Sequence, residues 1–276
     1  MSCNIETISQ KDIFHLSFPE AQTIVVCGDI HGDFNGMIYK LCQQCQLEDT
    51  LLIVAGDCGF GFERKGYYEE VMRRNQKRLS DSNNWVVFVR GNHDNPAYFD
   101  GRVINHKRFV AVPDYSIIEA GGSTILCVGG ATSIDRQHRI KAWQQKEGKE
   151  RRFSSSISQD PLAPNYYWEN ERPILNPEKL ELIGELFKVD TVITHTAPSF
   201  CELQSKSGLS YWCVGDEKLM DDVNAERATM DQLYQMIKEA QHPISNWYYG
   251  HFHQSCNQNI DGTLFRMLDI MEFHQL

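Results

Sequence analysis

The stretch TIVVCGDIHGDF, residues 23–34, joins a short run of β-branched residues to a turn that carries Asp29 and His31. An apolar run of this length is typical of a buried strand. Side chains two positions apart in an extended chain point the same way, so Asp29 and His31 would share one face if the strand continued past Gly28. The simpler alternative is an ordinary turn, because Gly and Asp are common turn residues. The rest of the chain decides between these two interpretations.

Four further apolar runs also end in Asp, Asn or His. LLIVA (51–55) runs into GDCGF, WVVFV (85–89) into RGNHD, TVIT (191–194) into HTAPS, and NWYY (246–249) into GHFH. Open α/β sheets bind ligands beyond the carboxyl ends of their strands, so we expect these endings to meet at one edge. With each residue type used roughly one time in twenty, GNHD alone is expected in only about one chain in 10³. Five such endings are therefore poorly explained by accident.

The polar residues at these endings are oxygen and nitrogen donors that suit divalent ions such as Mn, Fe or Zn. No cysteine is needed among them, which argues against a structural zinc clip. The set is larger than one ion needs, and two ions would use all of it if one carboxylate bridged them. The candidate ligands are Asp29, His31, Asp57, Asn92, His195, His251 and His253.

In their order along the chain, the endings resemble the signature blocks of the calcineurin-like metallophosphoesterase superfamily, and they span residues 28–253. The resemblance implies an α/β fold in which a β-sandwich of mixed sheets is flanked by helices. A dinuclear metal site would lie at the carboxyl ends of the strands. It further implies that His93 is not a ligand but meets the leaving group. The first metal would be held by Asp29, His31, Asp57 and His253, with Asp57 bridging to a second metal held by Asn92, His195 and His251.

Such a centre predicts an enzyme that hydrolyses phosphate esters with a metal-bridging hydroxide as nucleophile. His93 is the expected general acid, because departure of the leaving group needs a proton. The expected substrate is a phosphorylated small molecule, a nucleotide or a phosphoprotein.

Two alternatives remain open. One is a nuclease or phosphodiesterase acting on nucleic acid or nucleotides, and the other is a non-catalytic scaffold of the same fold. The net charge of −10, from 27 basic and 37 acidic residues, disfavours nucleic acid without excluding it. The complete ligand set counts against the scaffold.

The second block, GDCGFGFE at 56–63, departs from the protein serine/threonine phosphatases of the superfamily, which carry GDxxDRG there. It lacks the aspartate that would orient the histidine and the arginine that would clamp phosphate, which counts against a protein phosphatase. Asp94 follows His93 directly and is assigned no orienting role, because adjacent side chains do not easily face each other. GGATSIDRQHR (129–139) and YYWENE (166–171) are also similar to a subgroup of prokaryotic and phage-type phosphoesterases.

The chain is expected to form a single domain over residues 1–276, with helices over 67–80, 178–188 and much of 216–240. Residues 115–128 indicate a hairpin that turns at two glycines.

Residues 134–176 show no strand or helix periodicity and are basic near their start, so we expect an inserted, lid-like segment beside the site. Arg136 and Arg139 within it are candidate phosphate-binding residues. The alternative is that both are simply solvated.

The N-terminal residues lack the basic start and apolar core of a signal peptide. Nine scattered cysteines without disulfide-scaffold spacing indicate reduced thiols. No apolar stretch approaches the roughly 18 residues that a membrane helix needs. We therefore expect a cytoplasmic protein with no membrane partner.

Overall fold

The computed structural model describes residues 13–64, 66–150, 160–201 and 208–276. Its first sheet has six strands in the order β13-β2-β3-β4-β6-β5. The four central strands are parallel, and the two outer strands pair antiparallel to them. In that order the strands are β13 (Phe273–Gln275), β2 (Thr23–Cys27), β3 (Thr50–Val54), β4 (Trp85–Phe88), β6 (Phe109–Ala111) and β5 (Asn105–His106).

The second sheet has seven strands in the order β1-β7-β8-β9-β10-β12-β11 and is also mixed. The hairpin of β7 and β8 turns at Gly121 and Gly122, which both have positive φ, as a two-residue turn of this kind requires. In sheet order the strands are β1 (His15–Phe18), β7 (Ser116–Ala120), β8 (Ser123–Val128), β9 (Thr191–Thr194), β10 (Asn246–Tyr249), β12 (Thr263–Met267) and β11 (Cys256–Ile260).

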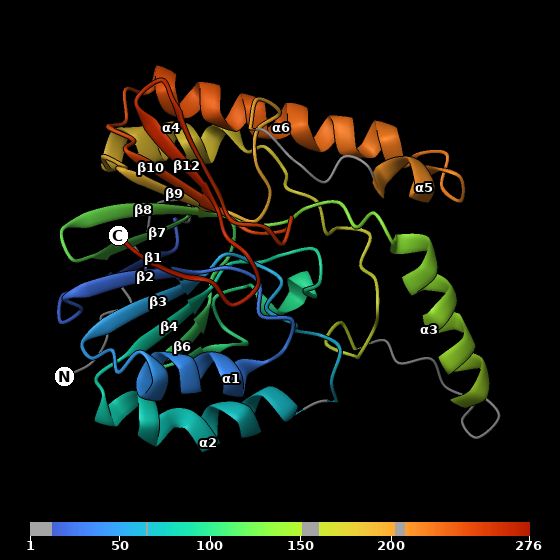
Figure 1. The fold of residues 1–276 in the computed structure, drawn as a ribbon, viewed down its shortest axis with the longest axis horizontal. Helices are drawn as coiled ribbons and strands as arrows, with labels where there is room; N and C mark the ends of the chain where they lie inside the picture. The colour runs from blue at the N-terminus through green and yellow to red at the C-terminus, as the bar shows by residue number, and fades with distance from the viewer. Residues whose placement is uncertain (1–12, 65, 151–159, 202–207) are drawn as a thin grey trace.

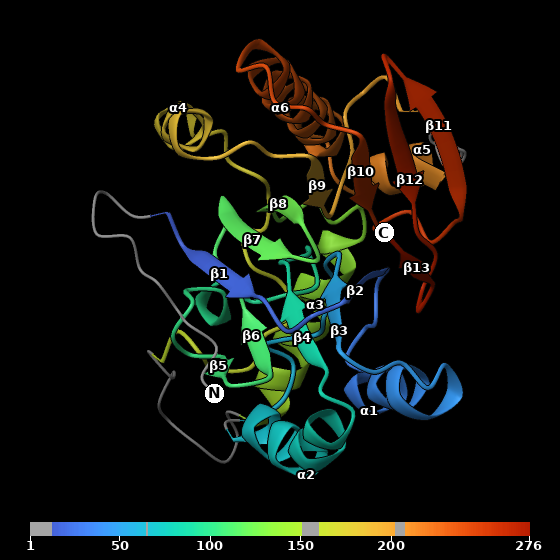
Figure 2. The same ribbon diagram turned by 90° about the vertical axis from the view of Figure 1, so that its left-hand side faces the viewer.

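The two sheets stack between two layers of helices (Figures 1 and 2). Helices α1 and α2 cover the six-stranded sheet, and α4 and α6 cover the seven-stranded sheet. Helix α3 projects from the end of the sandwich towards which the central strands point. The helices and short turns are α1 (Phe34–Tyr39), η1 (Lys40–Gln44), α2 (Tyr67–Asp81), η2 (Pro96–Tyr98), α3 (Arg136–Glu150), α4 (Pro177–Leu186), α5 (Leu209–Cys213) and α6 (Leu219–Glu239).

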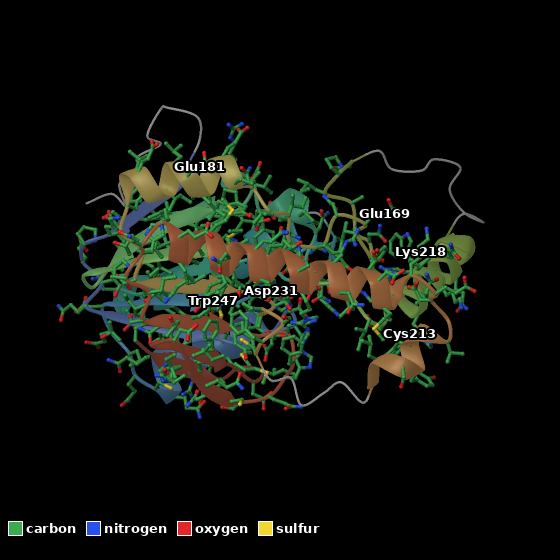
Figure 3. The ribbon with its side chains drawn as sticks, turned by 90° about the horizontal axis from the view of Figure 1, so that it is seen from above. Glu169, Glu181, Cys213, Lys218, Asp231 and Trp247 are labelled. Atoms are coloured by element: carbon green, nitrogen blue, oxygen red, sulfur yellow. The ribbon has the colours of Figure 1, made fainter. Side chains whose placement is uncertain are left out.

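Strand β2 shows why the central runs are apolar throughout. Val25 and Cys27 pack in the core beneath α1 and α2, whereas Ile24 and Val26 pack in the core between the sheets. A strand buried on both faces has no polar side, so it reads as a continuous apolar run. A third core lies under α4 and α6, and Figure 3 shows α6 lengthwise over this layer with Trp247 of β10 beside it. The prediction of a sandwich of mixed sheets flanked by helices is confirmed.

Residues 134–176 lack an apolar helical stripe, but the expectation of an irregular segment drawn from this is wrong for their first part, because α3 occupies Arg136–Glu150. Among the described side chains of α3, the buried ones are Arg136 and Arg139, each 8% exposed. The inner face of this helix is therefore charged, and a search for an apolar stripe does not detect it.

Residues 160–176 are packed into the body of the protein. Leu162 packs against the core of the six-stranded sheet, and Glu171 is 1% exposed. Arg90 donates a hydrogen bond of 2.6 Å to the carbonyl oxygen of Glu171. Residues 160–176 therefore do not form a lid. A lid beside the site remains a proposal only for α3. In the described ranges, no helix is long and apolar enough to cross a membrane.

Candidate metal centre

The central strands of both sheets end at the same edge of the sandwich, and the candidate ligands lie in the turns that follow them. Asp29 and His31 follow β2, Asp57 follows β3, Asn92 and His93 follow β4, His195 follows β9, and His251 and His253 follow β10. The contacts described below bring all of these side chains together.

The first group of candidate ligands converges on one point. Asp29, His31, Asp57 and His253 each offer one ligand atom, and these atoms lie within 4.8 Å of one another. The Nε2 atoms of His31 and His253 are 3.0 Å apart, and Nε2 of His253 is 3.0 Å from Oδ2 of Asp29. Among the described residues, Asp29 Oδ2 is buried without a hydrogen bond of good geometry. A buried carboxylate oxygen facing convergent imidazole nitrogens suits a bound cation.

The second group lies on the other side of Asp57. His195 Nε2 is 3.1 Å from Asp57 Oδ1 and 3.0 Å from Asn92 Oδ1. The rings of His195 and His251 have their centroids 5.0 Å apart. Asp57 Oδ2 lies 4.0 Å from His31 Nδ1, so the two oxygens of Asp57 face different groups. This position suits a carboxylate that bridges two cations.

The hydrogen bond at the other nitrogen of His195 fixes its orientation. His195 Nδ1 lies 2.8 Å from the carbonyl oxygen of Ala55, to which it donates its proton. In the neutral ring this hydrogen bond leaves the lone pair of Nε2 facing the centre, which is the tautomer that a metal ligand needs.

The two carboxylates give the centre a strong preference for positive charge. Burial raises the pKa of Asp57, but His195, His93 and His31 outweigh it and hold this pKa well below its usual range. Burial lowers the pKa of His195, but Asp57 and Asp29 outweigh it and raise this pKa to about 10. Burial, followed by the nearby His195, holds the pKa of His251 well below its usual range.

The backbone at the centre is strained at several candidate ligands. His31 (φ 43°), Asp57 (φ 44°), His251 (φ 68°) and His253 (φ 50°) all lie in the left-handed region. This region costs an L-residue about 1–2 kcal/mol. Such strain clusters at functional sites, where the surrounding structure holds it in place.

The glycines before the ligands leave room for the carboxylates. A Cβ atom on Gly250 would collide with Oδ1 of Asp29, and one on Gly91 would collide with Oδ1 of Asp57. Glycine is therefore required by packing immediately before His251 and before Asn92.

Asp94 organises the centre, although the sequence interpretation assigned it no role. It is fully buried and accepts backbone N–H groups from Cys58 (3.0 Å), Gly59 (2.7 Å), Phe60 (2.9 Å) and Gly91 (2.7 Å). These bonds tie the chain after Asp57 to the chain before Asn92. Burial, followed by the nearby Asp57, raises the pKa of Asp94 to about 7.

Ser133 orients Asn92. Its Oγ donates to Glu171 Oε2 (2.6 Å) and accepts from Asn92 Nδ2 (3.0 Å) and Arg139 Nη1 (2.6 Å). A hydroxyl has one donor and two acceptor sites, so its capacity is filled. Asn92 must then turn its amide nitrogen to Ser133 and its oxygen to the centre. The segments GGATSIDRQHR and YYWENE, which sequence reasoning could not connect, meet at this serine.

The two candidate arginines differ in their surroundings. Arg136 donates to Asp216 through Nε (2.5 Å) and Nη2 (3.0 Å) and pairs with Asp222 through Nη1 (2.6 Å). All three guanidinium nitrogens of Arg136 thus contact carboxylates, so we no longer expect Arg136 to bind phosphate. Arg139 Nη2 is buried and, in the described part of the chain, has no hydrogen-bond partner. Both arginines are 8% exposed, so the alternative of two solvated arginines is wrong.

His93 lies at the rim of the centre, between a candidate ligand and an aromatic ring. Its ring centroid is 5.4 Å from that of His31 and 6.2 Å from that of Phe62. Its backbone N–H donates to Asp57 Oδ1 at 2.7 Å. Burial lowers its pKa, and nearby Asp57 offsets part of this effect.

Comparison with known proteins agrees with this site. A family model described as calcineurin-like phosphoesterase matches residues 22–254. A search of curated proteins gives no significant match. Among solved structures, a dimetal phosphatase from Danio rerio is 10% identical, with a TM-score of 0.46 over 91% of this chain and 88% of that one. A protein from Thermus thermophilus is 11% identical, with a TM-score of 0.47 over 93% and 98%. Phosphopantetheinyl hydrolase from Mycobacterium tuberculosis is 14% identical, with a TM-score of 0.40 over 93% and 96%. Structural similarities this low say nothing about the function of this chain. Only the family match bears on its function.

Proposed function

The chain belongs to the calcineurin-like phosphoesterase family, which makes it a metal-dependent hydrolase of phosphate esters, and we propose that its reaction takes place at this edge of the two sheets. The observation that carries the proposal is the position of Asp57 between two groups of Asp, Asn and His ligands. In the proposal, one cation is held by Asp29, His31, Asp57 and His253. The other is held by Asp57, Asn92, His195 and His251.

Two divalent cations bound there would supply the Lewis acidity that activates a water nucleophile and neutralises charge on the phosphate. The donor set of imidazole, carboxylate and amide oxygen suits Mn, Fe and Zn alike.

The eight cysteines that the structure describes are free thiols, which supports our proposal of a reducing, cytoplasmic location.

His93 is proposed as the general acid that protonates the departing oxygen. Its ring lies beside that of the proposed ligand His31, which is the position that this role needs.

Arg139 is proposed to bind a phosphate oxygen. Its Nη1 donates to Ser133, and Ser133 in turn accepts a hydrogen bond from Asn92. A single side chain, Ser133, therefore links the Arg139 guanidinium to the proposed ligand Asn92. Its Nη2 is buried and, in the described residues, unpartnered. A buried guanidinium with a free donor is well suited to an anionic substrate.

The proposal is tested with a panel of esters on metal-reconstituted protein. We expect hydrolysis of small phosphate esters that is lost on chelation and restored by Mn²⁺ or another divalent ion, because the ligands alone do not supply the Lewis acid. The measurement is the initial rate on a monoester, a diester and a nucleotide, with metal content determined in parallel. Two bound metals without turnover of any ester would favour a non-catalytic scaffold instead.

Substituting Arg139 by Gln is expected to raise KM for phosphate monoesters by roughly 10–100-fold. Hydrogen bonds to charged groups contribute about 1.5–3 kcal/mol, and each 1.4 kcal/mol is a factor of ten. Lys141→Gln removes the same charge from an exposed position on the same helix and serves as the control. The measurement is KM together with the inhibition constant of inorganic phosphate. If both constants match the control, Arg139 has only a structural role.

A further inference from the structure

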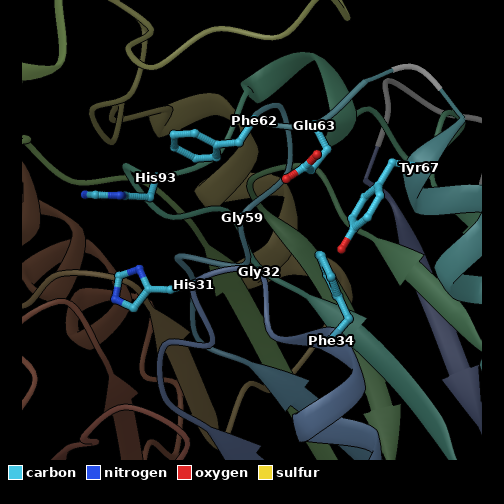
Figure 4. A pocket seen from close by; sticks show the side chains of 8 residues that line it. All are labelled: His31, Gly32, Phe34, Gly59, Phe62, Glu63, Tyr67 and His93. Atoms are coloured by element: carbon cyan, nitrogen blue, oxygen red, sulfur yellow. The ribbon is translucent and has the colours of Figure 1, made fainter. Parts of the chain in front are cut away.

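A cavity of about 280 Å³ opens beside the proposed metal centre. His31 and His93 form the wall nearest the ligands (Figure 4). The group attached to an oxygen that His93 protonates must lie next to His93, so this cavity begins where the leaving group of a bound ester lies. The other residues that line it are Gly32, Phe34, Gly59, Phe62, Glu63 and Tyr67.

One wall of the cavity is a fixed aromatic face. The Phe62 ring meets Trp168 edge-on, with centroids 5.3 Å apart, and the Arg139 guanidinium lies 5.8 Å from its centroid. The buried Tyr68 hydroxyl accepts the Gly61 N–H (2.6 Å) and donates to the Gly59 carbonyl oxygen (2.9 Å), which holds the loop that carries Phe62. A ring held in this way stacks on a planar ligand with little loss of conformational freedom.

Two glycines line the cavity between the histidines and Phe34 (Figure 4). Gly32 and Gly59 lie there, and a Cβ atom on Gly32 would meet nothing within 4 Å. The space beside the aromatic wall is therefore open to a flat group.

The side of the cavity away from the histidines carries the Phe34 ring and two polar side chains. Figure 4 shows the Glu63 carboxylate and the Tyr67 hydroxyl directed into it. An ionised carboxylate only accepts hydrogen bonds, and its two oxygens accept two parallel N–H groups. Among the bases that a nucleoside leaving group carries, guanine presents a ring N–H beside an amino group, whereas adenine presents an amino group beside an acceptor and uracil presents one N–H.

We infer that this cavity holds the base of a nucleoside monophosphate and prefers guanine. The inference rests on the proposed hydrolysis of phosphate esters, and it names the class of substrate. Phe62 stacks on the base, Glu63 accepts its N–H groups, and the phosphate lies at the metal centre beside His93.

The test compares kcat/KM for GMP, AMP, UMP and ribose 5-phosphate on the metal-reconstituted chain. GMP is expected to exceed ribose 5-phosphate by about tenfold or more, because stacking on an aromatic side chain contributes to the binding of every base. Glu63→Gln is expected to lower the ratio of GMP to AMP by about tenfold, because the amide turns one acceptor into a donor. Glu69→Gln removes the same charge from an exposed position on α2 outside the cavity, and it is expected to keep the wild-type ratio.

The outcomes separate this inference from the proposed function. If all esters are hydrolysed and ribose 5-phosphate matches GMP, the cavity is not a base site, although the hydrolase stands. If metals bind and no ester is hydrolysed, the proposed function fails. Calorimetry of guanosine with the metal-loaded protein then tests whether the cavity binds a base. Binding that Glu63→Gln weakens supports the base site, and no binding overturns it.

Discussion

Asp57→Asn is expected to weaken both metal sites together and to lower kcat/KM by roughly 10³. The Asp57 carboxylate faces His195 through one oxygen and His31 through the other, so it supplies charge to both proposed cation positions. The Lewis acidity of such ions contributes several kcal/mol to a transition state, and each 1.4 kcal/mol is a factor of ten in rate. Asparagine has nearly the same shape and keeps an oxygen that accepts the His93 N–H, so the fold is expected to persist.

His31→Ala provides the comparison for this prediction. A terminal imidazole serves one ion, so its loss is expected to weaken mainly the first site. Elemental analysis of both variants after dialysis, with circular dichroism to verify folding, measures the difference. Two tightly held metals in Asp57→Asn would show that the bridging assignment is wrong.

The sequence was sufficient to predict the sandwich and the edge where the site lies. Runs such as TIVVC are largely apolar because they are buried on both faces, and several of the polar residues after them are also buried but converge on one another at the end of the strands. Both signals are local, and parallel strands bring their carboxyl ends together. For this reason the positions of Asp29, Asp57 and His195 at one edge followed from the chain alone.

The features that were not predicted depend on distant partners or on buried charge. Asp94 acts through the backbone of a loop 35 residues away, and nothing in its own neighbourhood indicates this. Ser133 and Glu171 are 38 residues apart, and their contact has no periodicity that a sequence pattern could show. Helix α3 was missed because its buried positions are Arg136 and Arg139, so its inner face is stabilised by ion pairs and hydrogen bonds.

These unpredicted contacts also suggest how the site does without a GDxxDRG block. That block supplies an aspartate and an arginine in the superfamily's protein phosphatases, and here the corresponding loop is Gly59–Glu63. Asp94 holds this loop from the far side, and Arg139 approaches Phe62 from α3. In the proposed site the phosphate-binding charge therefore comes from Arg139 on α3, and the loop supplies Phe62 to the aromatic wall of the cavity.

His93→Ala is expected to lower kcat by roughly 10²–10⁴ on an alkyl phosphate, the usual contribution of a positioned general acid. The loss is expected to be small on a nitrophenyl ester, because an alkoxide needs a proton to depart and a nitrophenolate scarcely does. His93 is not among the proposed ligands of either site, so both metals are expected to stay bound. The measurement is kcat on both esters for wild type and variant, with metal content determined in parallel.

His106→Ala provides a matched control, since it removes an exposed histidine on β5 and is expected to leave both rates unchanged. Equal losses on the two esters, with metals retained, would mean that His93 stabilises charge in the transition state and transfers no proton. Loss of one metal would mean that His93 is a ligand. Proton transfer is the expected outcome because the His93 ring lies beside the proposed ligand His31 and also lines the cavity proposed for the leaving group.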